Sequence, residues 1–223
     1  MMRLLYFICL SVLCLQTVTA QPDSVLLTDD YRFKDGVYFG FRELCAGQPE
    51  IPVDQLEGRI VTNAETLITK SDYLAVKSDT GVVAIDLGRI WALCLDGLVY
   101  LPVPVQDHAF AAFAQLRTVG RLGYFEFEEK VDHKVTITAY NPLTKMPFRS
   151  ADLSRPKWET QTRVLDFTTG KISPADAGNL KRLTAGDAEL QKVLTNNTQA
   201  LTPEAGYRLI AAFNKRNALY LPR

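Results

Sequence analysis

The tripeptide Asp79-Thr80-Gly81 is the pattern in this chain with the most specific chemistry, because Asp-Thr-Gly carries the catalytic carboxylate of aspartic proteases. Those enzymes place two such loops face to face, and a dimer of this chain would have to supply the second one. The aspartate of such a loop follows buried apolar residues, whereas Lys77 and Ser78 stand here. Asp-Thr-Gly is also common turn chemistry, so we interpret the tripeptide as a turn.

An acidic segment in the middle of the chain could hold a hard metal cation through carboxylate oxygens. Its members are Glu126, Glu128, Glu129, Asp132 and His133. Their spacing fits neither an EF-hand loop nor a zinc site. In a strand, Glu126 and Glu128 share one face with Tyr124, while Phe125 and Phe127 point to the other. We therefore interpret the segment as the solvated face of a strand, and a hydrolase built on these carboxylates is the least favoured function.

Histidine-dependent catalysis would have to use His108 or His133, the two histidines of the chain. The sequence contains no Gly-x-Ser-x-Gly nucleophile elbow, and the residues around Cys94 resemble no thiol protease. Asn196-Asn197-Thr198 matches a glycosylation sequon, but such polar residues also end helices. The sequence therefore leads us to assign no catalytic residue, no cofactor and no metal ligand.

Aromatic residues on the expected strands could line a pocket for a lipid or a glycan. The candidates are Trp91, Tyr100 and Tyr124, together with Phe125 and Phe127. Aromatic side chains at strand positions more often belong to a hydrophobic core. A ligand pocket at these residues is thus an alternative to core packing.

The first twenty residues have the composition of a cleavable signal peptide. Arg3 supplies a positive charge, residues 4–15 are almost entirely apolar, and Val18 and Ala20 are small enough for the cleavage-site pockets. A membrane-spanning helix needs about 18 apolar residues, so this run is too short for one. The sequence predicts a signal peptide over 1–20, and an exported periplasmic or extracellular protein with no transmembrane segment in its mature chain.

Two cysteines, Cys45 and Cys94, remain once the signal peptide is removed. Export leads to an oxidising compartment, where these two thiols could pair as a disulfide. Both stand among apolar residues, however, and a free cysteine behaves as a small buried hydrophobe. The sequence leaves both states open and favours two buried thiols.

Composition places the chain among ordinary globular proteins, with 47% hydrophobic and 22% charged residues. Its 25 basic and 25 acidic residues balance, and the sequence has no basic stripe. A nucleic-acid-binding protein usually carries a basic excess, so nucleic acid is not the expected partner. The length fits one domain over residues 21–223.

Short β-branched and aromatic runs between turn residues predict a β-rich part over residues 30–172. Asp96-Gly97, between the expected strands 90–95 and 98–103, is the strongest hairpin signal of the chain. Further strands are expected over residues 37–39, 74–77, 82–87, 110–118, 122–128, 135–140 and 163–167.

The second half of the β-rich part is expected to contain one hairpin and one long loop. Residues 110–118 and 122–128 are expected to pair as a hairpin around Gly120. Residues 141–159 carry three prolines and no clear period, which predicts a long surface loop.

Helical periodicity predicts three helices over residues 173–217. Ser173 is the expected N-cap of the first helix, with Pro174 at its first position, and Thr202-Pro203-Glu204 opens the last one. Strands first and helices last favour an α+β fold over a parallel sheet. We expect a bent antiparallel β-sheet or small open barrel, with about three C-terminal helices packed on one side.

Seven phrases of the sequence, taken in order, carry a family resemblance. They are Asp35-Gly36-Val37-Tyr38, Phe41-Arg42-Glu43-Leu44, Pro49-Glu50-Ile51-Pro52, Ile90-Trp91-Ala92, Asp96-Gly97-Leu98-Val99-Tyr100, Leu165-Asp166-Phe167-Thr168-Thr169-Gly170 and Phe213-Asn214-Lys215-Arg216-Asn217-Ala218-Leu219-Tyr220. Together they resemble a group of uncharacterised exported proteins of Bacteroidetes-type bacteria, although Ala92 stands where a glycine is expected after the tryptophan. The resemblance implies export and a single domain, and it implies no catalytic or binding residue.

The function expected from these observations is that of a non-enzymatic cell-envelope or secreted protein. Such a protein would bind another envelope macromolecule or support envelope structure. The alternative is a β-barrel-like protein that binds a small lipid or glycan, and a hydrolase comes third.

Overall fold

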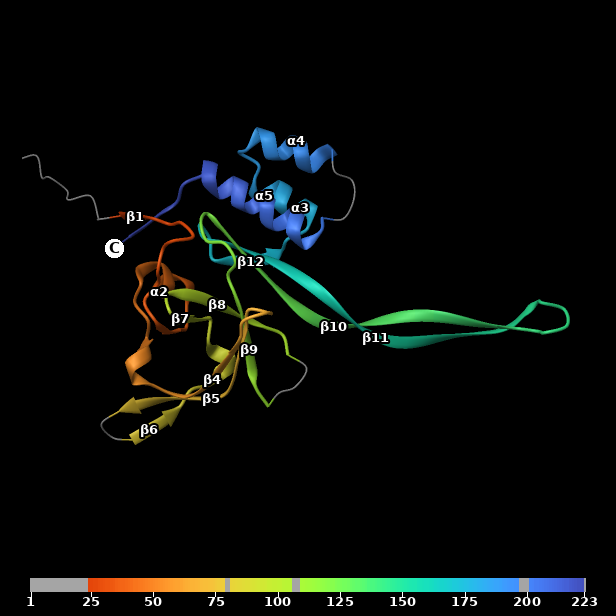
Figure 1. Ribbon diagram of the computed structural model, residues 1–223, viewed down its shortest axis with the longest axis horizontal. Coiled ribbons are helices and arrows are strands. Elements are labelled where there is room, and N and C mark those ends of the chain that lie inside the picture. Colours follow the sequence, from red (N-terminus) through yellow and green to blue (C-terminus); the bar gives the residue numbers. More distant parts are fainter. Residues whose placement is uncertain (1–23, 79–80, 106–108, 197–200, 223) are drawn as a thin grey trace, which may run out of the picture.

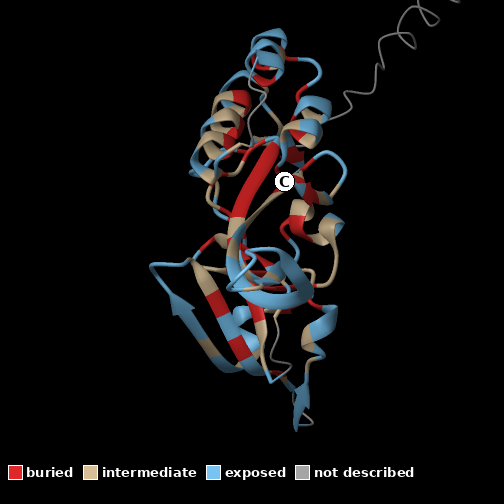
Figure 2. Cartoon of the chain, turned by 90° about the vertical axis from the view of Figure 1, so that its right-hand side faces the viewer, coloured by how far each residue is buried: buried red, intermediate tan, exposed pale blue. Residues whose placement is uncertain are grey.

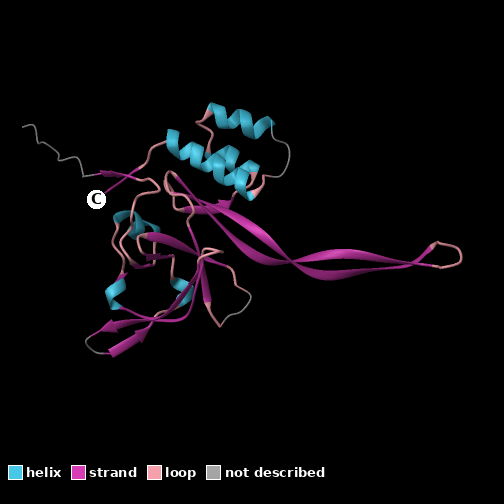
Figure 3. Ribbon diagram, viewed as in Figure 1, coloured by secondary structure: helices cyan, strands magenta, loops and turns pink. Residues whose placement is uncertain are grey.

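The computed structural model describes residues 24–78, 81–105, 109–196 and 201–222. The expected signal peptide, residues 1–20, lies outside the described residues. The described chain consists mostly of antiparallel sheet, with a barrel-like body, a group of short helices and a projecting two-stranded ribbon (Figure 1, Figure 3). The predicted α+β class built on a bent antiparallel sheet is therefore confirmed.

The body is built on an eight-stranded antiparallel sheet. Its strands are β2 (Gly36–Tyr38), β3 (Ile51–Pro52), β4 (Leu56–Asn63), β5 (Ile68–Ser78), β6 (Gly81–Ala84), β7 (Ala92–Leu95), β8 (Leu98–Val103) and β9 (Ala111–Gln115). The strand order is β3-β2-β7-β8-β9-β5-β4, and β6 also pairs with β5. The predicted hairpin at Asp96-Gly97 is confirmed: it joins β7 to β8, and its two residues have positive φ, 53° and 75°.

Short elements complete the body. Helix α2 (Phe41–Ala46) ends at Gly47, because that glycine adopts a φ of 60° and its N–H caps the carbonyls of the last turn. The others are η1 (Val53–Gln55), η2 (Leu87–Arg89), β1 (Ser24–Leu26) and β13 (Tyr220–Pro222). β1 pairs antiparallel with β13, so the two ends of the described chain lie side by side (Figure 1).

The ribbon consists of β10 (Leu122–Tyr140) and β11 (Pro147–Asp166), paired antiparallel along their whole length. The prediction of a surface loop over 141–159 is wrong, because most of that segment lies in β11. Proline interrupts central strands, but the ribbon has open outer edges, where the missing N–H of Pro156 is tolerated. The outer ribbon is also exposed on both faces, so no alternation of buried and exposed residues marks its strands.

The predicted hairpin around Gly120 is reduced to a single antiparallel bridge between Thr118 and Tyr124. The rest of the predicted pairing is wrong, because β9 pairs with β8 and β5 instead. The connection between β9 and β10 is held from elsewhere, because Asp29 Oδ1 accepts hydrogen bonds from Thr118 Oγ1 at 2.8 Å and from the Val119 N–H at 2.6 Å. β10 pairs with β11 instead. The two strands expected separately over 122–128 and 135–140 are parts of this one strand.

A short strand and three helices follow the ribbon. They are β12 (Lys171–Pro174), α3 (Ala177–Leu183), α4 (Ala188–Asn196) and α5 (Pro203–Arg216). The predicted N-cap at Ser173 is wrong, because β12 pairs with β11 there and Asp176 caps α3 by accepting the Asn179 N–H at 2.8 Å. α5 starts as predicted, with Thr202 accepting the Ala205 N–H at 3.3 Å. None of the described helices combines the length and apolar character needed to cross a membrane.

The inner end of β10 is packed on both faces. Phe125 and Phe127 point into the main core of the body, which also holds Tyr38, Leu101 and Leu165. On the opposite face, a second core joins β10 to the helices through Leu122, Tyr124, Leu180, Ile210 and Phe213. In Figure 2, which looks along the ribbon, the buried inner part of the strand contrasts with the exposed outer part. The ribbon is thus firmly anchored at one end and bare at the other.

Candidate functional site

The outer ribbon, residues 128–160, is the most distinctive feature of the structure, and we call it the arm. Glu128 lies opposite Thr160 at its inner end, and Tyr140 lies opposite Pro147 at its outer end. At the usual rise of a strand, this length corresponds to roughly 40 Å. Figure 1 shows the arm projecting away from the body and the helices.

The arm exposes an unusual share of apolar side chains. Half of the large hydrophobic residues that are exposed in the described chain belong to it. They are Val135, Ile137, Tyr140, Leu143, Met146, Phe148, Leu153 and Trp158. The other eight are scattered over the body, the helices and the chain ends. Scattered exposed apolar residues need no explanation, whereas a contiguous group marks a surface that contacts something else.

The middle of the arm has two chemically different faces. On one face, Val135 lies opposite Leu153 and Ile137 lies opposite Ala151; these four residues form what we call the apolar stripe. On the other face, hydroxyl and carboxylate groups bond across the strands. Thr136 Oγ1 donates to Asp152 Oδ1 at 2.6 Å, and the hydroxyls of Thr138 and Ser150 are 3.0 Å apart. The polar face is satisfied within the arm, and the apolar stripe is not covered by it.

The arm is fixed to the body at its inner end by polar groups that are buried or partly buried. The hydroxyl of Tyr124 lies 3.1 Å from Glu126 Oε2 and 3.0 Å from the carbonyl oxygen of Pro203, at the start of α5. Glu126 is also paired with the guanidinium of Arg117, which stacks 4.9 Å from the ring centre of Tyr207. Burial, followed by the charge of Glu126, raises the pKa of Tyr124, so its hydroxyl stays a neutral donor.

The acidic segment does not form a metal centre in the part of the chain that the structure describes. Glu126 is engaged by Arg117, and His133 Nε2 lies 2.9 Å from Glu159 Oε1 on the neighbouring strand of the arm. Among the described residues, no group of three or more histidine, cysteine, aspartate or glutamate side chains is arranged to hold a metal ion. Glu126 instead belongs to the anchor of the arm, and His133 pairs with Glu159 across its two strands.

The three candidate pocket aromatics are not brought together. Trp91 packs at the edge of the main core, with its ring centre 5.5 Å from that of Phe41. Tyr100 belongs to a different cluster within the sheet, and its hydroxyl donates to Gln115 Oε1 at 3.3 Å. Tyr124 lies in the core beneath the helices. Each therefore serves core packing in its own cluster.

Cys45 and Cys94 are free thiols in the structure. Burial raises the pKa of Cys45 to about 11 and that of Cys94 further still. Neither thiol is therefore activated as a nucleophile.

Several sequence candidates fall outside the described residues. They are Asp79, Thr80, His108, Asn197 and Thr198. Ser78 and Gly81 flank Asp79 and Thr80 in the sequence and pair with each other. Ser78 Oγ donates to the Gly81 carbonyl at 3.1 Å. This pairing joins β5 to β6, and the interpretation of the tripeptide as a turn stays a prediction.

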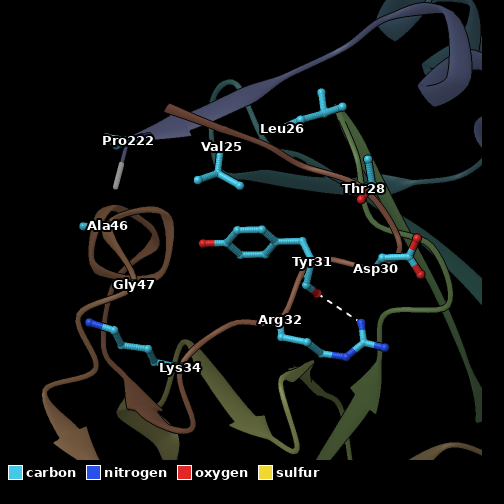
Figure 4. Close-up of a pocket in the computed structure, with 10 residues that line it drawn as sticks. All are labelled: Val25, Leu26, Thr28, Asp30, Tyr31, Arg32, Lys34, Ala46, Gly47 and Pro222. Atoms are coloured by element: carbon cyan, nitrogen blue, oxygen red, sulfur yellow. Dashed lines mark hydrogen bonds between the residues drawn. The ribbon is translucent and has the colours of Figure 1, made fainter. Parts of the chain in front are cut away.

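A shallow pocket of about 560 Å³ lies where β1 and β13 approach α2 (Figure 4). Tyr31 forms its centre, and Val25, Ala46 and Pro222 contribute apolar walls. The guanidinium of Arg32 donates to the carbonyl oxygens of Asp29 and Tyr31, at 3.0 and 3.2 Å, so it is used locally. The sequence analysis did not single out these residues, which carry no recognisable ligand pattern.

Comparisons of the chain with models of protein families, with curated proteins and with solved structures find no match. The resemblance to exported Bacteroidetes-type proteins therefore stays a prediction. The strand expected over 135–140 belongs to the arm, and the turn residues Asn141-Pro142 follow it. Its partner strand was missed, because residues 147–159 contain no threonine, valine or isoleucine.

Proposed function

We propose that the protein is an exported, non-enzymatic binding or structural module of the cell envelope, which holds a protein partner through the arm. The observation that carries this proposal is the apolar stripe on an arm that the body does not cover. A two-stranded ribbon has no core of its own and is marginally stable in water. Contact with a partner would bury the stripe and order the arm at the same time.

The charges of the arm favour a protein partner over nucleic acid. The arm carries five acidic and six basic residues in mixed order, so neither sign dominates. They are Glu128, Glu129, Lys130, Asp132, Lys134, Lys145, Arg149, Asp152, Arg155, Lys157 and Glu159. Nucleic-acid surfaces are uniformly basic, whereas a mixed rim around an apolar centre is typical of protein interfaces.

The rest of the chain would act as a mount for the arm. We propose that the three C-terminal helices, packed on one side of the inner ribbon, and the barrel-like body on the other side hold the arm at a constant angle. The tight packing of Phe125 and Tyr124 on opposite faces of β10 supports this role. Export to the periplasm or the exterior follows from residues 1–20 and is part of the proposal.

Site-specific photo-crosslinking in intact cells tests the proposal. A photoreactive residue at Ile137, in the apolar stripe, should crosslink to one reproducible protein. The same residue at Thr138, on the opposite face, and at Val83, an exposed apolar position of β6, should give much less of that adduct. Equal labelling from all three positions would overturn the proposal.

A matched pair of charge substitutions provides a second test of the proposal. Val135→Asp places a charge in the apolar stripe, and Thr136→Asp places the same charge on the polar face one residue away. We expect Val135→Asp to reduce the Ile137 crosslink by about tenfold or more, as loss of an interface anchor does, and Thr136→Asp to leave it largely intact. Equal effects of the two variants would mean that the stripe is not the contact surface.

A further inference from the structure

The outer end of the arm, residues 140–149, is different in composition from the apolar stripe, and we call it the tip. Its large side chains are Tyr140, Leu143, Met146 and Phe148, which are 60%, 92%, 69% and 69% exposed. The tip carries two basic residues, Lys145 and Arg149, and no acidic one. It is thus an apolar end with a positive rim.

The backbone of the tip satisfies its own hydrogen-bond donors. Asn141 organises the turn: its Oδ1 accepts the N–H groups of Leu143 and Thr144, at 2.9 and 3.3 Å, and its carbonyl accepts the Lys145 N–H at 2.8 Å. The N–H of Asn141 itself donates to the carbonyl of Met146 at 2.9 Å.

The remaining positions of the turn complete this arrangement. The N–H of Met146 lies 3.5 Å from Thr144 Oγ1, and Pro142 and Pro147 have no N–H to satisfy. From residue 141 to residue 147, every backbone donor is therefore either bonded inside the tip or absent. Asn141 bonds its own backbone two residues on, as asparagine also does in turns exposed to water. A segment that enters hydrocarbon needs every donor satisfied, because each unsatisfied backbone group is costly there.

We infer that the tip inserts into the surface of a lipid bilayer that carries anionic lipids. The four large apolar side chains would enter the boundary between headgroups and acyl chains, where Tyr140 suits the interface. Lys145 and Arg149 would contact the lipid phosphates, and the long lysine side chain can extend back to them. The positive rim and the absence of acidic residues give the charge complementarity that selects an anionic surface.

The ribbon itself limits how far the tip can enter. Beyond the segment that pairs with β12, neither outer edge of the β10–β11 ribbon has a neighbouring strand in the described chain. Backbone groups on open edges need water, so the paired part of the arm stays outside the hydrocarbon. Only the turn and its adjoining aromatic residues enter, and the apolar stripe remains free. The inference therefore goes beyond the proposed function and does not depend on it.

Vesicle sedimentation of the chain over residues 21–223 tests the inference. We expect it to sediment with vesicles of phosphatidylglycerol and phosphatidylethanolamine, and far less with vesicles of phosphatidylcholine alone, at low salt. The double variant Leu143→Asp/Phe148→Asp should lower the binding by about tenfold or more. The control Val82→Asp/Val83→Asp, which changes two exposed apolar residues of β6, should bind like the unmodified protein.

Two further measurements separate the contribution of the basic residues from that of the inserted apolar side chains. Lys145→Gln/Arg149→Gln should weaken binding to the anionic vesicles and reduce its dependence on salt. In Leu143→Trp, tryptophan fluorescence should shift to shorter wavelength when anionic vesicles are added, because the new indole leaves water. The shift should exceed that of the unmodified protein, whose signal comes from Trp91 and Trp158.

No sedimentation with anionic vesicles, or equal binding by the Leu143→Asp/Phe148→Asp variant, would overturn the inference. Crosslinking of the tip to a protein without vesicle binding would overturn it in favour of a protein pocket. These outcomes are independent of the Ile137 crosslink, so failure of the lipid inference and failure of the proposed function are distinguishable.

Discussion

The side-chain amide of Asn214, on helix α5, makes two hydrogen bonds with the backbone of Leu122 at the start of β10. Nδ2 donates to the Leu122 carbonyl oxygen at 2.7 Å, and Oδ1 accepts the Leu122 N–H at 2.9 Å. Leu122 is only 1% exposed, so water does not readily reach its side of the strand. The amide thus takes the place of a neighbouring strand and ties the root of the ribbon to the helices.

Replacement of Asn214 by alanine should destabilise the protein by about 2–4 kcal/mol, because a buried donor and a buried acceptor of Leu122 lose their partner. Urea denaturation followed by circular dichroism measures the change. Asn179→Ala, which removes an exposed amide bonded to Asp176, should cost much less. If the two variants were equally stable, the bonds to Leu122 would not be holding the ribbon.

The body of the fold could be predicted from local signals because its turns carry specific residues. Asp96-Gly97 has the positive φ angles that a tight hairpin needs, and Gly47 ends α2 in the left-handed conformation. Both signals depend on a few neighbouring residues. The N-cap of α3 was misplaced by three residues, because pairing of Ser173 with Val164 on β11 extends β12 and delays the helix.

The pairing of the arm could not be predicted in the same way, because its two strands pack against no hydrophobic core. The alternation over Val135-Thr136-Ile137-Thr138 indicates a strand, but residues 147–159 contain no β-branched residue to mark its partner, and Pro156 argued for a loop. The tip was missed for a related reason. The bonds of Asn141 to Leu143, Thr144 and Lys145 depend on side-chain geometry that the sequence does not reveal.

The thiol of Cys45 should react slowly with iodoacetamide at neutral pH. Burial raises its pKa to about 11, so at about pH 8 only about one thiol in a thousand is ionised, and the rate should rise about tenfold per pH unit. Cys94, which is fully buried, should react only after unfolding, and Cys94→Ser assigns the signals. Fast labelling of the folded protein would contradict this expectation. Absence of both thiols in the unfolded, unreduced chain would mean that they form the disulfide that the sequence left open.

Asp187→Asn should destabilise the protein at neutral pH and much less in acid. Asp187 Oδ2 accepts a hydrogen bond from Arg216 Nε at 2.8 Å, and this bond holds the pKa of the carboxyl below its ordinary value. A carboxyl whose pKa is lowered by folding stabilises the folded protein, and this contribution is fully present at pH values above the ordinary carboxyl pKa of about 3.9. It is lost as the pH falls through the pKa of the folded state. Asparagine can still cap α4 by accepting the Leu190 N–H, so the substitution isolates the charge.

Urea midpoints of Asp187→Asn and of the unmodified protein, compared near neutrality and in acid, measure this effect. Their difference should shrink as pH falls below the ordinary carboxyl range. Glu204→Gln, which removes the exposed pair with Arg208, should change little at either pH. A difference between Asp187→Asn and the unmodified protein that stays constant with pH would show that the ion pair with Arg216 contributes nothing.

Amide hydrogen exchange of the isolated protein should separate the arm from its anchor. Residues 122–127 of β10 are packed on both faces, so their amides should exchange only when the protein unfolds globally. The amides of the arm should exchange much faster even where the strands are paired, because a ribbon without a core opens locally at little cost. β8, in the middle of the sheet, provides a protected reference within the same molecule. Equal protection of the arm and β8 would mean that the arm is stable by itself and needs no partner for order.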